Sequence, residues 1–144
     1  MKLRIVVPCY NEKEVLPHTA ERLLAELSRL EGLGLVHPGS GLLFVDDGSL
    51  DGTWSVIETL AQGNTKVAGL KLSRNQGHQQ ALKAGLDHAD ADVAISMDAD
   101  LQDDPGAMEP MLRAHLSGAD VVYGVRQRSE EHTSELQSRF GISY

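Results

Sequence analysis

Two aspartates separated by a single residue form the strongest candidate site in the sequence. Asp98 and Asp100 directly follow a short apolar run, and their carboxylates would repel each other unless a cation lay between them. Oxygen ligands of this kind suit Mg²⁺ or Mn²⁺, which bridge carboxylates to substrate phosphates. Gln102 adds a carbonyl oxygen as a third potential ligand. The alternative is a polar turn in which Asp100 or Asp103 caps the helix that begins near Pro105.

The segment Pro8–Glu12, which follows the first apolar run, combines an aromatic ring, an amide and a carboxylate. Tyr10 can pack against a flat nucleobase, and Glu12 can pair with the polar edge of that base. In the alternative interpretation, Asn11 caps the next helix and Tyr10 fills a gap in the core. Cys9 has no basic neighbour and an apolar run behind it, which predicts an inert buried thiol.

A second pair of aspartates, in the segment Asp46–Ser49, follows another apolar run. The carboxylate of Asp47 can accept hydrogen bonds from a nucleobase or a ribose, and Gly48 permits a tight turn. The alternative is a turn followed by a helix, with Ser49 or Asp51 as the helix cap. Both interpretations can hold together because they use different residues.

Two arginines and a histidine are candidates for contact with phosphate groups. Arg74 precedes a helix that starts near Gly77, and a helix N-terminus with an adjacent arginine is a plausible phosphate site. His78 is either a proton carrier or a ligand of an acceptor phosphate, unless it is an ordinary loop histidine. Arg126 either neutralises a diphosphate or is a simple surface charge. The sequence contains no Walker-type loop, zinc-ligand spacing, GxGxxG fingerprint or Ser-His-Asp order.

The elements that position these residues alternate between short β-branched runs and amphipathic stretches. We expect strands at Leu3–Val7, Leu42–Val45, Val67–Leu72, Val93–Ser96 and Asp120–Tyr123. We expect helices at Glu14–Leu30, Asp51–Ala61, Gln76–His88 and Met108–Leu116. This order predicts an α/β fold with right-handed crossovers and a mainly parallel sheet covered on both faces. Ligands of such sheets bind at the carboxyl ends of the strands, where the candidate residues lie.

Length and composition limit the classes of protein that remain. The 144 residues suit one domain, and the formal net charge of −8 argues against binding to a nucleic-acid backbone. A single cysteine excludes an internal disulfide framework and a cysteine-based zinc site. The first residues lack the pattern of a signal peptide, and no window approaches the roughly 18 apolar residues of a membrane span. We therefore expect this chain alone to be soluble and cytoplasmic.

The last seventeen residues interrupt the pattern of strands and helices. Residues 128–138 read RSEEHTSELQS, which resembles the in-frame translation of a common sequencing adapter. The adapter continues with a variable index and then with codons for Ile-Ser-Tyr, the residues found at 142–144. We expect residues 128–144 to be a non-native tail without a further strand, and the native reading frame to have been cut short.

Taken together, the motifs resemble the inverting glycosyltransferases of family 2, which have the GT-A fold. The resemblance is strongest to the polyprenyl-phosphate sugar transferases, of the dolichol-phosphate mannose synthase and bactoprenol glucosyltransferase types. It covers residues 3–127 and rests on five motifs: VVPCYNEKEVL, FVDDGSLDGT, LSRNQGHQQALKAGLDHA, MDADLQDDP and VVYGVR. The chain departs from the family at Gln76 and Asp104, where Phe and Pro are common. The resemblance implies that residues 1–127 form the nucleotide-sugar-binding part of a three-layer, Rossmann-like catalytic domain.

The resemblance also implies roles for individual residues. The nucleotide-sugar site would consist of Pro8, Tyr10, Asn11, Glu12, Val45, Asp47, Asp98, Ala99, Asp100 and Arg126. Asp98, Asp100 and Gln102 would bind Mg²⁺ or Mn²⁺. Arg74 and His78 would face the acceptor phosphate, and the catalytic carboxylates would be Asp98, Asp100 and Asp103.

The implied reaction is the transfer of a hexose from UDP or GDP to a polyprenyl phosphate, with inversion at the anomeric carbon. A lipid phosphate is already anionic near neutral pH, so it needs no strong general base. If a glycan hydroxyl were the acceptor, Asp103 or Asp104 would have to take its proton. A third possibility is a fragment that binds nucleotide-sugar without catalysis. Family members of this kind usually carry membrane segments later in the chain, which implies that the full-length protein acts at the cytoplasmic face of the membrane. The sequence predicts no oligomeric state.

Overall fold

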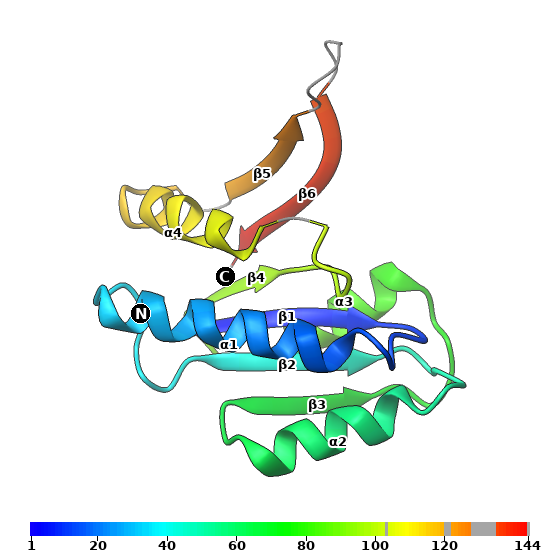
Figure 1. Cartoon of the computed structure of the whole chain (residues 1–144). Coiled ribbons are helices and arrows are strands. Elements are labelled where there is room, and N and C mark those ends of the chain that lie inside the picture. Colours follow the sequence, from blue (N-terminus) through cyan, green and yellow to red (C-terminus); the bar gives the residue numbers. More distant parts are fainter. Residues whose placement is uncertain (103, 120–121, 128–134, 144) are drawn as a thin grey trace.

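The computed structural model contains a six-stranded sheet with helices on both faces (Figure 1). It describes all residues except 103, 120–121, 128–134 and 144. The strands are β1 (Leu3–Cys9), β2 (Gly41–Asp46), β3 (Val67–Lys71), β4 (Val93–Ser96), β5 (Val122–Gln127) and β6 (Glu135–Ser143). The helices are α1 (Leu16–Gly32), α2 (Thr53–Gly63), α3 (His78–Asp87) and α4 (Met108–Leu116), with a 3-10 turn at Pro105–Ala107.

The strand order in the sheet is β3-β2-β1-β4-β6-β5. The first four strands are parallel, whereas β6 runs antiparallel to both of its neighbours, β4 and β5. The predicted α/β class and mainly parallel sheet are therefore confirmed. None of the helices in the described part of the chain combines the length and the apolar character needed to cross a bilayer.

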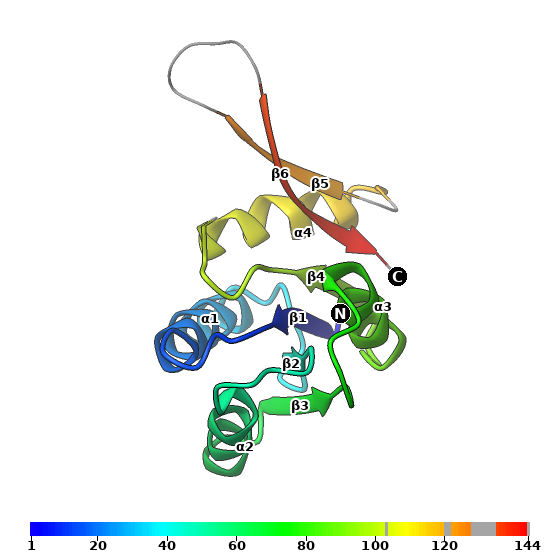
Figure 2. The same ribbon diagram turned by 90° about the vertical axis from the view of Figure 1, so that its right-hand side faces the viewer.

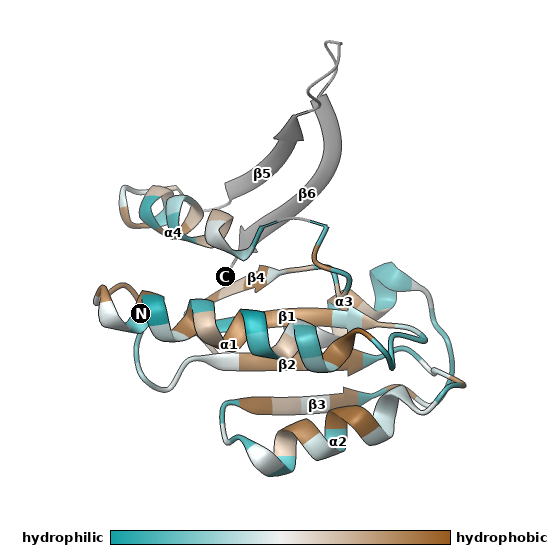
Figure 3. Ribbon diagram, in the orientation of Figure 1, coloured by the Kyte–Doolittle hydropathy of each residue, from teal (hydrophilic) through white to brown (hydrophobic). Residues whose placement is uncertain are grey.

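Helices α1 and α2 cover one face of the parallel strands, and α3 covers the other (Figure 2). The side chains of β1 alternate between these faces: Ile5 and Val7 join the larger apolar core, while Val6 joins the smaller core under α3. Burial on both faces explains why β1 and β2 are almost continuously apolar rather than alternating with polar residues, whereas β3, at the edge of the sheet, is largely exposed (Figure 3).

Helix α3 lies unusually close to the sheet at Gly85. A Cβ atom at this position would overlap Val6 and would lie 2.8 Å from a methyl carbon of Val45. A glycine is therefore required where the helix crosses β1 and β2. This contact sets how closely α3 packs on β1 and β2.

The predicted bounds differ from the structure mainly where loops meet helices. β4 and α4 have the predicted bounds, but α1, α2 and α3 each begin two residues later than expected. The delay has a local cause before α2 and α3, because Gly52 and Gly77 have φ angles of 92° and 97°, outside the helical region. The two residues before each of these helices instead belong to the loops near the candidate site.

The expectation that no strand follows residue 127 is wrong. Residues 135–143 form β6, which is hydrogen-bonded to β4 on one side and to β5 on the other. Strand pairing uses backbone groups, which every residue type except proline supplies in full, so a polar segment can fill an open strand edge. The expected strand at Asp120–Tyr123 is shifted to Val122–Gln127, and residues 120–121 lie outside the described residues.

Candidate functional site

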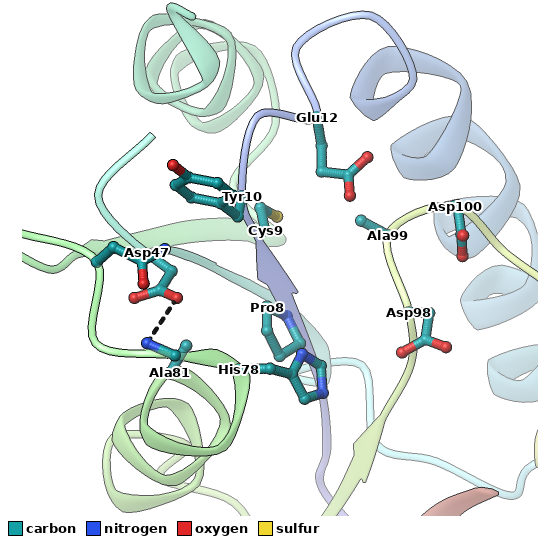
Figure 4. A pocket seen from close by; sticks show the side chains of 12 residues that line it. Pro8, Cys9, Tyr10, Glu12, Asp47, His78, Ala81, Asp98, Ala99 and Asp100 are labelled. Carbon is teal, nitrogen blue, oxygen red and sulfur yellow. Dashed lines mark hydrogen bonds between the residues drawn. The ribbon is translucent and has the colours of Figure 1, made fainter. Parts of the chain in front are cut away.

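A pocket of about 460 Å³ opens at the carboxyl ends of β1, β2 and β4, beside the N-terminal end of α3 (Figure 4). The chain passes from β1 to β2 and β3 on one side, and then returns to place β4 on the other side of β1. Open α/β sheets bind ligands where the strand order reverses in this way. The pocket is lined by Pro8, Cys9, Tyr10, Glu12, Asp47, Asn75, Gly77, His78, Ala81, Asp98, Ala99 and Asp100.

The loop after β1 places Tyr10 and Glu12 in the pocket wall. Tyr10 is 43% exposed, so the alternative in which it fills a gap in the core is wrong. Asn11 does not cap α1, which begins only at Leu16 and has no side-chain cap. Its side chain instead accepts a hydrogen bond from the amide of Leu50, and it lines a neighbouring hollow rather than the pocket.

Cys9 is buried at the base of the pocket, and its thiol donates to the carbonyl oxygen of Val7 at 3.2 Å. Burial raises the pKa of this thiol, and the carboxylates of Glu12 and Asp46 raise it further. The thiol is therefore neutral at physiological pH, in agreement with the predicted inert cysteine.

Asp47 is buried, and its carboxylate binds the loop between β3 and α3. Its two oxygens accept hydrogen bonds from the amides of Gln76 (2.7 Å) and Gly77 (3.1 Å). Gly48, with a φ of 70°, lets the turn after β2 approach this loop so closely that a Cβ would lie 2.5 Å from the carbonyl carbon of Arg74. Asp47 thus shapes the pocket by fixing a second loop.

Two other residues near the end of β2 have structural roles outside the pocket: Asp51 at the start of α2, and Val45 in the core. The N-cap of α2 is Gly52, which has no side-chain cap, but Asp51 accepts from the amide of Thr53 at 3.0 Å and so satisfies one free amide at the start of the helix, as predicted for Ser49 or Asp51. The hydrogen bond from the Thr53 hydroxyl also lowers the pKa of the Asp51 carboxyl. Val45 is fully buried in the core beneath α3 and is not among the residues that line the pocket.

Asp98 and Asp100 lie on the loop after β4, on either side of Ala99, and all three line the pocket (Figure 4). The hydroxyl of Thr19 in α1 lies 2.5 Å from the carbonyl oxygen of Ala99, which ties this loop to the helix. Gln102 is not a pocket residue; its side-chain amide donates to Asp100 at 2.9 Å and so orients that carboxylate.

The predicted helix cap near Pro105 is supplied by a residue other than those proposed. Asp104 accepts a hydrogen bond from the amide of Gly106 at 2.9 Å, so Asp100 does not have this capping role. Asp103, expected to be catalytic, lies outside the described residues.

The loop before α3 and the first residue of that helix bring three residues to the pocket, of which only His78 was predicted as a site residue. His78 is the first residue of α3 and is exposed, and it lines the pocket with Asn75 and Gly77. Arg74 is exposed and is not a lining residue. Asn75 follows Arg74 in the segment between a strand and a helix, and this position in the sequence could have identified it as a site residue. The backbone of Arg126 lies in β5, two strands beyond β4.

A family model described as Glycosyl transferase family 2 matches residues 4–141. This chain belongs to that family. The match continues past residue 127 and so includes most of the segment that resembles an adapter.

Curated relatives of this family 2 glycosyltransferase are longer proteins. It is 45% identical over 133 residues to the "uncharacterized glycosyltransferase YkoT" of Bacillus subtilis (strain 168), covering 91% of this chain and 40% of that protein. It is 37% identical to the bactoprenol glucosyl transferase of Shigella phage SfV (92% and 41% covered). It is 36% identical to the undecaprenyl-phosphate 4-deoxy-4-formamido-L-arabinose transferase of Proteus mirabilis (strain HI4320; 90% and 38%). The chain thus spans about 40% of the length of these relatives.

Solved structures share the fold at low sequence identity. The mannosyltransferase PcManGT of Pyrobaculum calidifontis, in complex with GDP-Man and Mn²⁺, matches with a TM-score of 0.55 and 24% identity, covering 69% of this chain and 27% of that one. Mannosyl-3-phosphoglycerate synthase of Rubrobacter xylanophilus matches with a TM-score of 0.63 and 20% identity (85% and 39% covered). These structures are glycosyltransferases of the GT-A type, and the predicted fold class is confirmed.

The charges in the pocket of the family 2 glycosyltransferase suit a divalent cation. Burial raises the pKa of Glu12, and the carboxylates of Asp100, Asp51 and Asp98 raise it further, so negative charge is concentrated here. No group of three acidic, histidine or cysteine ligands exists among the described residues. Mg²⁺ needs no such group, because it commonly uses one or two carboxylates and completes its shell with water and substrate phosphates.

Proposed function

We propose that this chain contains the donor-binding part of an enzyme that transfers a hexose from UDP or GDP to a polyprenyl phosphate with inversion. The observation that carries the proposal is the position of Asp98 and Asp100 in one pocket with Tyr10 and Glu12, at the reversal of strand order. Acidic ligands on one side and an exposed aromatic ring on the other match the diphosphate and the base of a nucleotide-sugar.

In this proposal Asp98 and Asp100 hold Mg²⁺ or Mn²⁺, while Gln102 keeps the Asp100 carboxylate in place. The ion, when bound, offsets the charge that develops on the departing nucleoside diphosphate. Tyr10 packs against the base, and Glu12 binds its polar edge or the ribose. Asp47 holds the loop that carries Asn75 and His78.

The acceptor is proposed from the relatives and from the chemistry of the pocket. Two relatives carry names that specify bactoprenol or undecaprenyl phosphate. His78 lies at the N-terminal end of α3, where backbone amides favour an anion, so it can bind the acceptor phosphate, with Arg74 and Arg126 as further candidates. A lipid acceptor requires reaction at a membrane surface, and we propose the cytoplasmic face.

Calorimetric titration with GDP and with UDP tests the donor site. We expect binding in the presence of Mn²⁺ and little in excess chelator, and about tenfold or greater weakening in Asp100→Asn, which removes one charged ligand. Asp87→Asn is the control, because this exposed carboxylate of α3 pairs only with Lys83 among the residues that the structure describes. Equal binding with and without chelator would refute the metal site. Incubating donor with lipid phosphate or with glycan then distinguishes the two acceptor classes.

We also infer that residues 128–144 are encoded by adapter DNA. The support is the residue pattern of the segment, and the backbone pairing of β6 is compatible with any extended sequence. Sequencing the gene directly from source DNA is the test. We expect the codons to diverge from the present ones after Gln127, and codons that read through to Tyr144 would contradict the inference.

A further inference from the structure

Three successive backbone amides in the loop after β1 are each bound by a side chain from the loop after β2 or from the first residue of α2. These amides belong to residues 11, 12 and 13, which lie between the end of β1 and the start of α1. The acceptors are the hydroxyl of Ser49 for Asn11 (2.9 Å), the hydroxyl of Thr53 for Glu12 (3.0 Å) and the carboxylate of Asp51 for Lys13 (3.3 Å). We call this set of three side chains the loop clamp.

The central member of the loop clamp has a defined direction of hydrogen bonding. Thr53 is fully buried, and its hydroxyl donates its proton to Asp51 at 2.5 Å. A hydroxyl has one proton and two lone pairs, so the Thr53 oxygen is left to accept from Glu12. The carboxylate of Asp51 can only accept, which fixes this direction and leaves no competing role for the hydroxyl.

The loop clamp holds a backbone turn that separates two pocket residues. Asn11 has a φ of 53°, a left-handed conformation that costs energy for a residue other than glycine. Its side chain accepts from the amide of Leu50 at 2.8 Å while its own amide donates to Ser49, so the two loops bind each other reciprocally. On either side of this turn, Tyr10 and Glu12 both line the pocket.

Glu12 needs such support because its surroundings repel it. Its carboxyl points towards Ala99, on a loop that carries the like-charged Asp98 and Asp100 (Figure 4). Repulsion between these carboxylates favours conformations in which Glu12 turns away from the pocket. A fixed backbone at Glu12 opposes that movement before any ligand arrives.

We propose that Thr53, oriented by Asp51, is a positioning residue that holds Glu12 and Tyr10 in the geometry that receives a nucleoside diphosphate. The expected effect on nucleotide binding rests on the proposed function. The hydrogen bonds of the loop clamp exist independently of it. Preorganisation of this kind raises affinity because the ordering cost is met before binding.

Thr53→Val tests the loop clamp because it keeps the shape of the side chain and removes the hydroxyl. We expect the amide of Glu12 to exchange with deuterium about tenfold faster or more, since it loses its acceptor. We expect GDP or UDP, with Mn²⁺, to bind about tenfold more weakly. Thr53→Ser keeps the hydroxyl and should retain exchange and affinity within about twofold of the unchanged chain. Thr59→Val is the matched control in the same helix, because the Thr59 hydroxyl bonds only to the carbonyl oxygen of Ser55 within the described part of the chain.

A second variant covers the case in which Thr53→Val fails to fold. Ser49→Ala removes the acceptor of the Asn11 amide at a partly exposed turn, and we expect faster exchange at Asn11 together with weaker nucleotide binding. The proposal is overturned if folded variants keep slow exchange, or if exchange rises while affinity stays unchanged. If the unchanged chain binds no nucleotide while the Glu12 amide still exchanges slowly, the proposed function is contradicted, and with it the positioning role. If the amides of residues 11–13 exchange rapidly in the unchanged chain, only the loop clamp is contradicted.

Discussion

The hydroxyl of Thr19 lies 2.5 Å from the carbonyl oxygen of Ala99, although the two residues are 80 positions apart in the chain. The contact joins a buried site in α1 to the loop that carries Asp98 and Asp100. Leu101, two residues after Ala99, has a left-handed φ of 51°, so the backbone reverses sharply here. A hydroxyl group outside the pocket therefore ties down the backbone between the two carboxylates.

Replacing Thr19 with Val should weaken the proposed metal site. The variant leaves the Ala99 carbonyl without this donor, and we expect the free energy of unfolding to fall by about 1–3 kcal/mol. We also expect weaker Mn²⁺ binding, measured by electron paramagnetic resonance in the presence of GDP. Thr19→Ser should restore both properties, and a Val variant that binds Mn²⁺ normally would show that Thr19 has only a structural role.

Replacing Asp47 with Asn should loosen the loop before α3. An amide group presents one acceptor instead of two, so one of the amides of Gln76 and Gly77 would face an N–H group. We expect faster hydrogen exchange at these two amides and a loss of stability of about 1–3 kcal/mol. Exchange rates equal to those of the unchanged chain would contradict the assigned contact, and Asp87→Asn again serves as the control.

Replacing Gly85 with Ala should destabilise the protein even though alanine favours helices. Helix propensity alone predicts a gain of about 1 kcal/mol. The added Cβ would overlap Val6 and press against Val45, and overpacking of this kind typically costs about 1–3 kcal/mol. We expect a net loss in urea denaturation. Gly63→Ala is the control, since a Cβ at the end of α2 meets no atom within 4 Å; equal gains in both variants would contradict the close packing of α3.

The thiol of Cys9 should react slowly in the folded protein and make stability fall in alkali. Burial raises its pKa in the folded state, so the unfolded chain releases the proton first as the pH rises through about 8.5. Above that pH this residue lowers the free energy of unfolding by about 1.4 kcal/mol per pH unit. Cys9→Ala should flatten this slope, and Ellman's reagent should react rapidly only in denaturant. Fast reaction of the native protein at neutral pH would refute the assignment.

The elements of this fold and the general place of its site could be read from the sequence. β4 and α4 have the bounds that hydrophobic spacing predicts, and polar residues after apolar runs do meet at one edge of the sheet. Local patterns suffice for this, because helix and strand periodicity are expressed within a few residues. The family followed from five motifs in order.

Only the tertiary structure decided which partner each polar side chain has. Asp47 lines the pocket where it was expected, but the sequence did not show that its carboxylate also binds the amides of a loop about thirty residues later. No pattern in the sequence assigned these contacts to Thr19, Thr53 or Asn75, although Thr53 ends the FVDDGSLDGT motif and Asn75 lies in the LSRNQGHQQALKAGLDHA motif. β6 was missed because its pairing depends on the free edge of β4. Hydrogen bonds between distant residues need atoms within about 3 Å, and it is the packing of helices on the sheet that brings such atoms together.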